Sequence, residues 1–158
     1  MPSGRVHSSN TILTSALMLI GSIFADPMYL SNADVLSLVL GCLSGIVLSP
    51  DLDVNSGYIG LYYLKRIWII GPLLSLLWWI FWLPYRWIIP HRSWLSHLPG
   101  VSTVLRELVL IVPIYFTLSI LRIPLQPAWR FLGLFTIGLT ISDTYHAYAD
   151  WMSGEYKE

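Results

Sequence analysis

Histidine and aspartate residues gather at the ends of the apolar stretches of this sequence, where they could act together as metal ligands. The residues of this kind are His7, Asp51, Asp53, His91, His97, Asp143, His146 and Asp150. Imidazole nitrogen combined with carboxylate oxygen suits Zn, Mn, Fe or Ni, whereas Ca and Mg prefer oxygen ligands alone. These residue types therefore predict a site for a divalent transition metal.

Two of the ligand segments have a spacing that favours a shared centre. Asp143, His146 and Asp150 are separated by three and four residues, so on a helix their side chains lie on one face. Asp51 and Asp53 form an Asp-x-Asp pair, which can bridge two ions or bind them separately. The candidate ligands exceed the four of a single tetrahedral zinc site, so a centre of two metal ions with open positions fits better. The expected cofactor is one or two zinc ions, with Mn or Fe as alternatives.

The same residues have a simpler interpretation. Apolar helices place polar residues at their ends whatever the protein does, so any one of these residues also fits a helix cap or an interfacial group. Asp26 and Asp34, in the loop after the first apolar stretch, are expected to be of this kind. The metal interpretation depends on whether the ligands meet in space.

The composition indicates a membrane protein. Of the 158 residues, 55% are hydrophobic and only 11% are charged, whereas a typical soluble domain has about a quarter of its residues charged. The high hydrophobicity excludes intrinsic disorder. The formal net charge of zero gives no electrostatic basis for binding nucleic acid. The single cysteine, Cys42, excludes a disulfide framework and a cysteine-based metal site.

Five apolar stretches approach the length of about 20 residues that a helix needs to cross a bilayer. They lie at about 8–25, 33–49, 67–83, 108–121 and 128–152. The third contains Gly71-Pro72, which can break a helix, and a run of tryptophans up to Trp87, so it is predicted to be re-entrant or interfacial. The sequence therefore predicts one all-α domain over 1–158, an integral membrane bundle of about four transmembrane helices plus this Trp-rich segment.

This topology places every candidate ligand on one side of the membrane. The basic residues of that side are Arg5, Lys65, Arg66, Arg86, Arg92, Arg106 and Lys157, and those of the other side are Arg122 and Arg130. The excess predicts that the ligand side faces the cytoplasm. The interiors of the four spans hold no ionisable residue, which argues against a transporter.

Four motifs occur in order along nearly the whole chain: Met1-Pro-Ser-Gly-Arg-Val-His7, Leu48-Ser-Pro-Asp-Leu-Asp53, Pro90-His-Arg-Ser-x-x-Ser-His97 and Asp143-x-x-His146-x-x-x-Asp150. Together they resemble a cyanobacterial family of metal-binding membrane proteins, a domain of unknown function. That family is similar to the LexA-binding, inner-membrane-associated metal-dependent hydrolases and, more remotely, to zinc-dependent phospholipase C. The resemblance implies a plasma or thylakoid membrane location and seven metal ligands, which are His7, Asp51, Asp53, His91, His97, His146 and Asp150. Ser93 and Ser96 depart from the Gly and Thr that the hydrolases favour.

A metal centre of this kind predicts hydrolysis of a phosphoester, such as a phospholipid, at the cytoplasmic membrane face. Two metal ions can activate water and stabilise both oxygens of an in-line displacement. Arg92, beside His91, is predicted to clamp phosphate, or else to be an interfacial cation. Asp143 is predicted to orient His146 or to act as a general base, or else to be a polar group of the helix face.

The alternative is a non-catalytic membrane protein that binds a structural metal through the same residues and acts as an assembly or docking factor. The Trp-rich segment at 78–87 would then contact a membrane-protein partner, whereas in the enzyme it would contact membrane lipid. An enzyme needs a metal position that is open to water, whereas a structural site is coordinatively closed.

Overall fold

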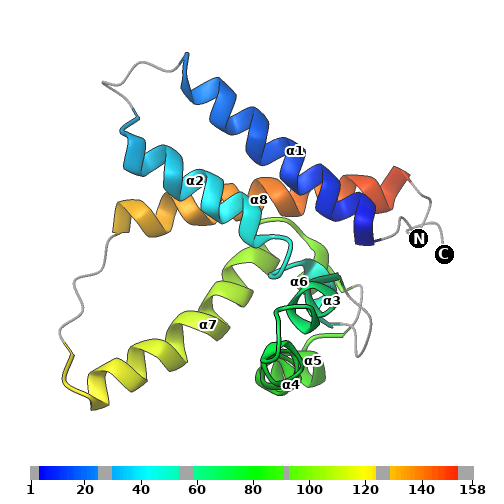
Figure 1. Ribbon diagram of the computed structural model, residues 1–158, viewed down its shortest axis with the longest axis vertical. Coiled ribbons are helices and arrows are strands. Elements are labelled where there is room, and N and C mark those ends of the chain that lie inside the picture. Colours follow the sequence, from blue (N-terminus) through cyan, green and yellow to red (C-terminus); the bar gives the residue numbers. More distant parts are fainter. Residues whose placement is uncertain (1–3, 25–29, 54–58, 91–92, 124–128, 153–158) are drawn as a thin grey trace.

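The computed structural model describes residues 4–24, 30–53, 59–90, 93–123 and 129–152, and for residues 4–7, 59, 60 and 94 it describes the backbone alone. Within these ranges the chain forms helices and turns and no strand, which confirms the all-α prediction. The helices are α1 (Gly4–Ser22), α2 (Asn32–Ser44), the short 3-10 helix η1 (Pro50–Asp53), α3 (Ile59–Lys65), α4 (Gly71–Phe81), α5 (Leu83–Ile88), α6 (Trp94–His97), α7 (Val101–Ile120) and α8 (Trp129–Met152). Figure 1 shows α1 and α2 packed across α8, with α7 and the group α3–α6 extending from this trio.

Helices α2 and α8 make the most extensive contact and run in the same direction. Near the start of both, Ser37 Oγ donates to the carbonyl oxygen of Phe131 at 2.8 Å. A Cβ atom added at Gly41 or Gly138 would lie 2.0 Å from a backbone oxygen of the facing helix, so only glycine allows this close approach. Because the two helices run in the same direction, the residues that follow α2 and the last turns of α8 reach the same end of the molecule.

Asp34 joins the beginnings of α2 and α8. Its side chain accepts a hydrogen bond from the backbone N–H of Ser31 at 2.8 Å and completes a capping box. It also forms an ion pair with Arg130 of α8, with 2.6 Å between Nε and Oδ1. The hydrogen bond from Arg130 is the main reason why the pKa of Asp34 is held below its usual range. The expectation that Asp34 caps a helix is thus confirmed.

The hydrophobic core lies at the other end, where α2 finishes. It comprises Leu48, Leu52, Leu61, Trp82, Tyr85, Ile89 and Leu139. The Trp-rich segment supplies its aromatic part, since Trp82 is fully buried and meets the rings of Trp78 and Tyr85 edge to face. Gly71-Pro72 begins α4 where a break within a helix was predicted, because proline is well tolerated in the first turn.

The lengths of the described helices differ from the predicted spans. Among the described residues, α7 is the one helix that is both long and apolar enough to cross a membrane. The apolar stretch at 33–49 folds into only 13 residues of α-helix followed by turns, about 20 Å of rise against a hydrocarbon core of about 30 Å. The Trp-rich stretch is divided into α4 and α5, with 11 and 6 residues. The prediction of four spanning helices is therefore not confirmed by helix length and hydropathy.

Candidate metal centre

Three elements bring one carboxylate and two imidazoles together. Asp51 lies in η1, His97 ends α6, and His146 lies in the second half of α8. One ligand atom of each residue lies within 4.8 Å of the corresponding atoms of the other two. The shared direction of α2 and α8 explains the meeting of Asp51 with His146, and the position of α6 against η1 and α7 adds His97.

Two further carboxylates complete the cluster. Asp53 Oδ2 lies 3.7 Å from His97 Nδ1. His146 Nε2 lies 3.2 Å from Asp150 Oδ2 and 3.4 Å from Asp51 Oδ1. The two imidazole rings are 6.3 Å apart between centroids. The structure therefore gathers five of the predicted ligands into one site. They come from the short helices η1 and α6 and from the long helix α8.

The remaining predicted site residues stand apart from this cluster or beyond what is described. His7 lies in α1, but its side chain is outside the described part of the structure. His91 and Arg92 lie outside the described residues, so ligation by His91 and phosphate binding by Arg92 stay predictions. Asp143 lies one turn before His146 in α8, and its bonded partners are Arg106 and Thr103.

The cluster is largely shielded from solvent, with one more open position. Asp53, His97, His146 and Asp150 are buried, whereas the side chain of Asp51 keeps 26% of its surface exposed. A cavity of about 10 Å³ reaches Asp51 and His146, and its lining includes Ser8, Thr11, Ser49 and Ser142. This volume corresponds to about one water molecule. Asp51 is thus the ligand through which the site meets solvent.

The pKa values of the two imidazoles are shifted in opposite directions. His97 lies in α6, and His146 lies in α8 beyond its apolar part at 131–141. Burial lowers the pKa of His97, and the charges of Asp53 and Asp51 oppose this effect without outweighing it. Burial is the largest single influence on His146 and acts to lower its pKa, but the contacts and negative charges of Asp150 and Asp51 together outweigh burial and raise the pKa to about 9. The site therefore strongly attracts positive charge between Asp51 and Asp150.

The donors suit a divalent transition metal. Two imidazoles and three carboxylates form a mixed nitrogen and oxygen set of the kind that Zn, Mn and Fe accept. Three carboxylates within one mostly buried cluster are costly unless a cation compensates their charge. No described sulfur ligand contributes, because Cys42 is buried in α2 and contacts a carbonyl of α1.

A family model of proteins described as "Uncharacterized metal-binding protein (DUF2227)" matches residues 2–136. The chain belongs to this family. The match covers Asp51, Asp53 and His97 and ends before His146 and Asp150, which the structure places beside them. No curated protein and no solved structure matches the chain.

As a member of a metal-binding family, the chain is expected to fix its histidines by hydrogen bonds behind the metal. Ser96, which is fully buried, places its hydroxyl 2.8 Å from His97 Nδ1 and 3.1 Å from the carbonyl oxygen of Ser93. When this hydroxyl donates to the Ser93 carbonyl, it accepts from Nδ1, and Nε2 of His97 is then available to the metal. Ser96 thus contacts one of the candidate ligands directly.

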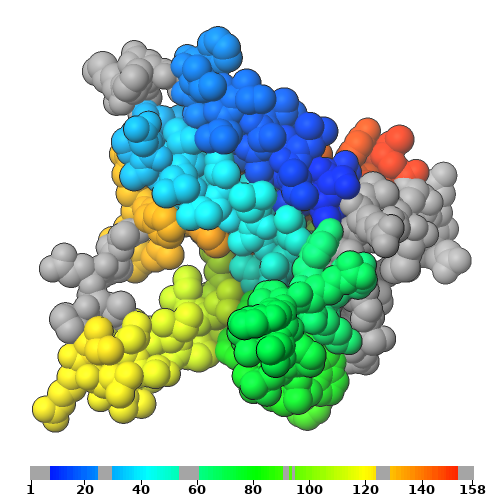
Figure 2. All heavy atoms as spheres, viewed as in Figure 1, coloured from blue at the N-terminus to red at the C-terminus, as the bar shows by residue number. Residues whose placement is uncertain are grey.

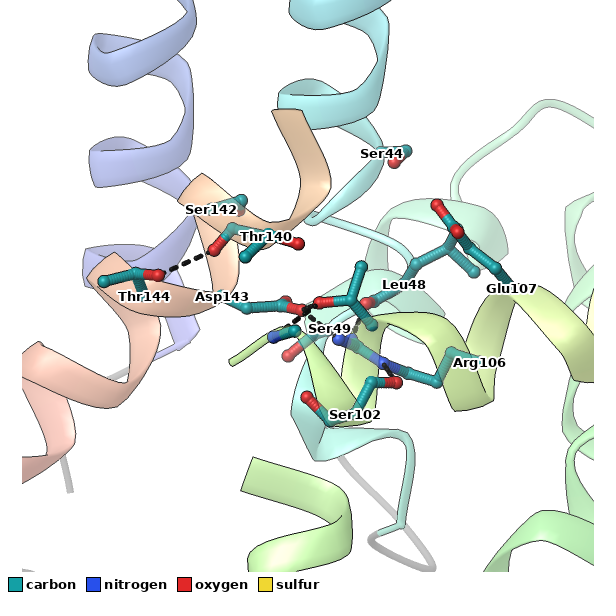
Figure 3. Close-up of polar contacts among 12 residues, drawn as sticks. Ser44, Leu48, Ser49, Ser102, Arg106, Glu107, Thr140, Ser142, Asp143 and Thr144 are labelled. Atoms are coloured by element: carbon teal, nitrogen blue, oxygen red, sulfur yellow. Dashed lines mark hydrogen bonds and ion pairs between the residues drawn. The ribbon is translucent and has the colours of Figure 1, made fainter. Parts of the chain in front are cut away.

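Two buried arginines hold the backbone around Asp51 and Asp53. Arg86 of α5 donates through Nε to the carbonyl oxygen of Leu52 at 2.7 Å. Arg106 of α7 donates to the carbonyl oxygen of Leu48 and forms an ion pair with Asp143 of α8 (Figure 3). Both contacts fix the segment that carries the Asp-x-Asp pair.

Sequence reasoning treated these arginines only as interfacial positive charge. Arg106 is fully buried, and its signal in the sequence is that a cation adjoins the apolar run of α7, where an ionisable residue normally needs a partner. That partner, Asp143, is 37 residues away in the sequence. The pairing of the two could not be read from local spacing.

Proposed function

We propose that this metal-binding protein is embedded in a membrane and hydrolyses a phosphoester, such as a phospholipid, at the cytoplasmic surface. The observation that carries the proposal is the convergence of Asp51, His97 and His146, with Asp53 and Asp150, at one end of a set of apolar helices. One or two zinc ions, or Mn or Fe, are the metals that this donor set favours.

Exposed apolar side chains support a membrane location. Large hydrophobic residues are exposed along α1, such as Leu13 and Leu17, and along α7, such as Phe116 and Ile120. Figure 2 shows the second half of α7 projecting from the rest of the molecule. Soluble monomers rarely expose apolar surface on this scale, whereas a hydrocarbon environment favours it. We propose that α1, α2, α7 and α8 are the membrane helices and that the local bilayer adapts to the short α2.

Each residue of the centre has a defined part in this proposal. Asp51, His97 and His146 would hold the metal, while Asp53 and Asp150 would orient the two imidazoles or complete the ligand set. When bound, a divalent metal would supply Lewis-acid stabilisation of the phosphoryl oxygens and activation of water. Asp51, as the partly exposed ligand, marks the side from which a substrate would approach.

The test measures metal content and phosphodiesterase activity of the purified full-length protein in detergent or lipid nanodiscs. Wild-type protein loaded with zinc or manganese should cleave bis-(p-nitrophenyl) phosphate or a vesicle phospholipid, and Asp51→Asn should abolish cleavage. Asp34→Asn is the matched control, because it makes the same change in a helix-capping aspartate at the other end of α2. Equal activity in the two variants would refute hydrolysis at this centre.

A second candidate function is a non-catalytic docking factor with a structural metal. The burial of Asp53, His97, His146 and Asp150 favours it, since structural sites are closed to solvent. A metal-loaded protein that cleaves no member of a broad phosphoester panel, yet loses its fold when the metal is chelated, would support this function over hydrolysis.

A further inference from the structure

Arg106, a residue that no ligand motif includes, lies at the meeting point of the elements that carry the metal ligands. Its side chain is fully buried. Its Nε donates to the carbonyl oxygen of Ser102 in its own helix at 3.1 Å. Its two terminal nitrogens reach the carbonyl oxygen of Leu48 and the carboxylate of Asp143. The guanidinium thus joins α7 to the end of the α2 segment and to α8 (Figure 3).

The contacts of Arg106 with Leu48 and Asp143 each lie three residues before a candidate metal ligand in the sequence. Leu48 is three residues before Asp51 and precedes η1. Asp143 is three residues before His146, so in α8 the two side chains lie on the same face, one turn apart. A displacement of either contact would therefore move a ligand with it.

The third ligand is connected through Thr103. Thr103 Oγ1 donates a hydrogen bond to Asp143 Oδ2. Thr103 Oγ1 also accepts a hydrogen bond from the backbone N–H of Gly100 at 3.3 Å. Gly100 is three residues after His97, at the turn between α6 and α7. Asp143 therefore receives Arg106 from one direction and the α6–α7 turn from another.

We infer that the buried cluster of Arg106, Asp143 and Thr103 positions the metal centre by fixing Asp51, His97 and His146 relative to one another. Arg106 suits this position because its planar group offers several donors in fixed directions, and a lysine ammonium cannot reproduce that pattern. Asp143 is then a positioning residue whose Oδ2 accepts hydrogen bonds from both Arg106 and Thr103. The inference rests on the metal centre and does not require the proposed hydrolysis.

The test compares Co²⁺ binding by full-length wild-type protein, Arg106→Lys and Arg130→Met in the same detergent. The affinity is measured by competition with a chelator, the coordination geometry by the visible absorption of bound Co²⁺, and the fold by circular dichroism. Arg130→Met is the matched control, because it breaks an Arg–Asp pair of the same type at the other end of α2 and α8. Arg106→Lys should bind Co²⁺ about 10- to 100-fold more weakly with a changed spectrum, and the control should match the wild type.

Thr103→Val keeps the inference testable if Arg106→Lys does not fold. This change keeps the side-chain volume and removes only the hydroxyl that links Asp143 to the α6–α7 turn, so it should also weaken Co²⁺ binding and alter the spectrum. Folded variants at 103 and 106 with wild-type affinity and spectrum would overturn the inference while leaving the metal centre intact. A wild-type protein that binds no Co²⁺ would overturn the metal centre itself, and the inference with it.

Discussion

The two ends of the α2–α8 helix pair each carry an arginine–aspartate ion pair, but the surroundings differ. At the starting end, the Arg130 side chain that pairs with Asp34 is 70% exposed. At the far end, the side chains of Arg106 and Asp143 are 0% and 1% exposed, and Thr103 shares the same carboxylate. An exposed pair is screened by water and weakly restrains its helices, whereas a buried pair must keep its partners in place. The buried end is the one at which the candidate metal ligands converge.

The largest expected effect is on metal content at the buried end. The double variant His97→Ala, His146→Ala removes both imidazoles of the centre, so the purified protein should lose its metal, which is about one or two ions per chain for such a site. Elemental analysis of the purified protein measures this directly. Unchanged metal content in the double variant, alongside a wild-type level in Arg130→Met, would show that the metal binds elsewhere.

Removal of the buried arginine should give the largest loss of stability. Arg106→Met leaves the Asp143 carboxylate buried without its cation, which should lower the free energy of unfolding by about 3–5 kcal/mol. Denaturant unfolding followed by circular dichroism measures the change. A loss no greater than that of Arg130→Met would mean that the two ends are energetically alike.

The helix contact that connects the two ends gives a sharper, intermediate prediction. Gly138→Ala places a Cβ atom 2.0 Å from the Leu38 carbonyl oxygen and should destabilise the protein by about 1–3 kcal/mol. Gly133→Ala in the same helix meets no atom within 4 Å and should be neutral or stabilising by up to about 1 kcal/mol. Thermal unfolding of both variants tests whether close packing holds α2 and α8 together, and equal midpoints would refute it.

A change of pH should act on the buried end alone. His146 faces Asp51, Asp150 and His97, and its pKa of about 9 exceeds the ordinary histidine value of 6.5. Its contribution to the stability of metal-free protein is therefore complete below 6.5 and lost as the pH rises through about 9. His97 has the opposite sign, because its lowered pKa disfavours the protonated form that acid produces.

Metal-free protein should therefore be most stable near neutral pH and less stable toward pH 9. Asp34, at the other end, does not titrate in this range, because the pKa of an aspartate is ordinarily well below it and Arg130 lowers the pKa of Asp34 further. Thermal unfolding in chelator between about pH 6 and 10 measures the trend. His146→Gln should remove the alkaline decline, and a decline that persists in this variant would assign it to another group.

The smallest effect is expected from the exposed pair. Arg130→Met should shift the unfolding midpoint only slightly, because water and salt screen the pair and the Ser31–Asp34 capping box remains. Scanning calorimetry in low and high salt would detect the difference. A shift as large as that of Arg106→Met would remove the contrast between the two ends.

The sequence predicted the helical class and named five candidate ligands that the structure brings together, since both predictions depend on residue type. The ends of apolar stretches carry Asp51, Asp53, His97, His146 and Asp150. Helices that run in the same direction, such as α2 and α8, bring the residues at their ends together. The i, i+4 spacing of His146 and Asp150 gave a contact that the structure confirms at 3.2 Å.

The helix boundaries and the positioning residues could not be predicted in the same way. The apolar stretch at 67–83 begins with turns in which Trp68 has a positive φ of 34°, and its helix starts only at Gly71. Hydropathy does not distinguish such turns from a helix. The partners of Arg106 come from α2 and α8, so its role depends on tertiary contacts that no local pattern records.

The most direct test of a shared metal centre is X-ray absorption spectroscopy at the metal edge, on zinc-loaded full-length protein and on the His97→Ala, His146→Ala variant. The wild-type spectrum should show nitrogen and oxygen ligands with the multiple-scattering pattern of imidazole and no sulfur, and the variant should lose the imidazole pattern. A wild-type spectrum without imidazole, or one that the double substitution leaves unchanged, would contradict a centre built from Asp51, His97 and His146.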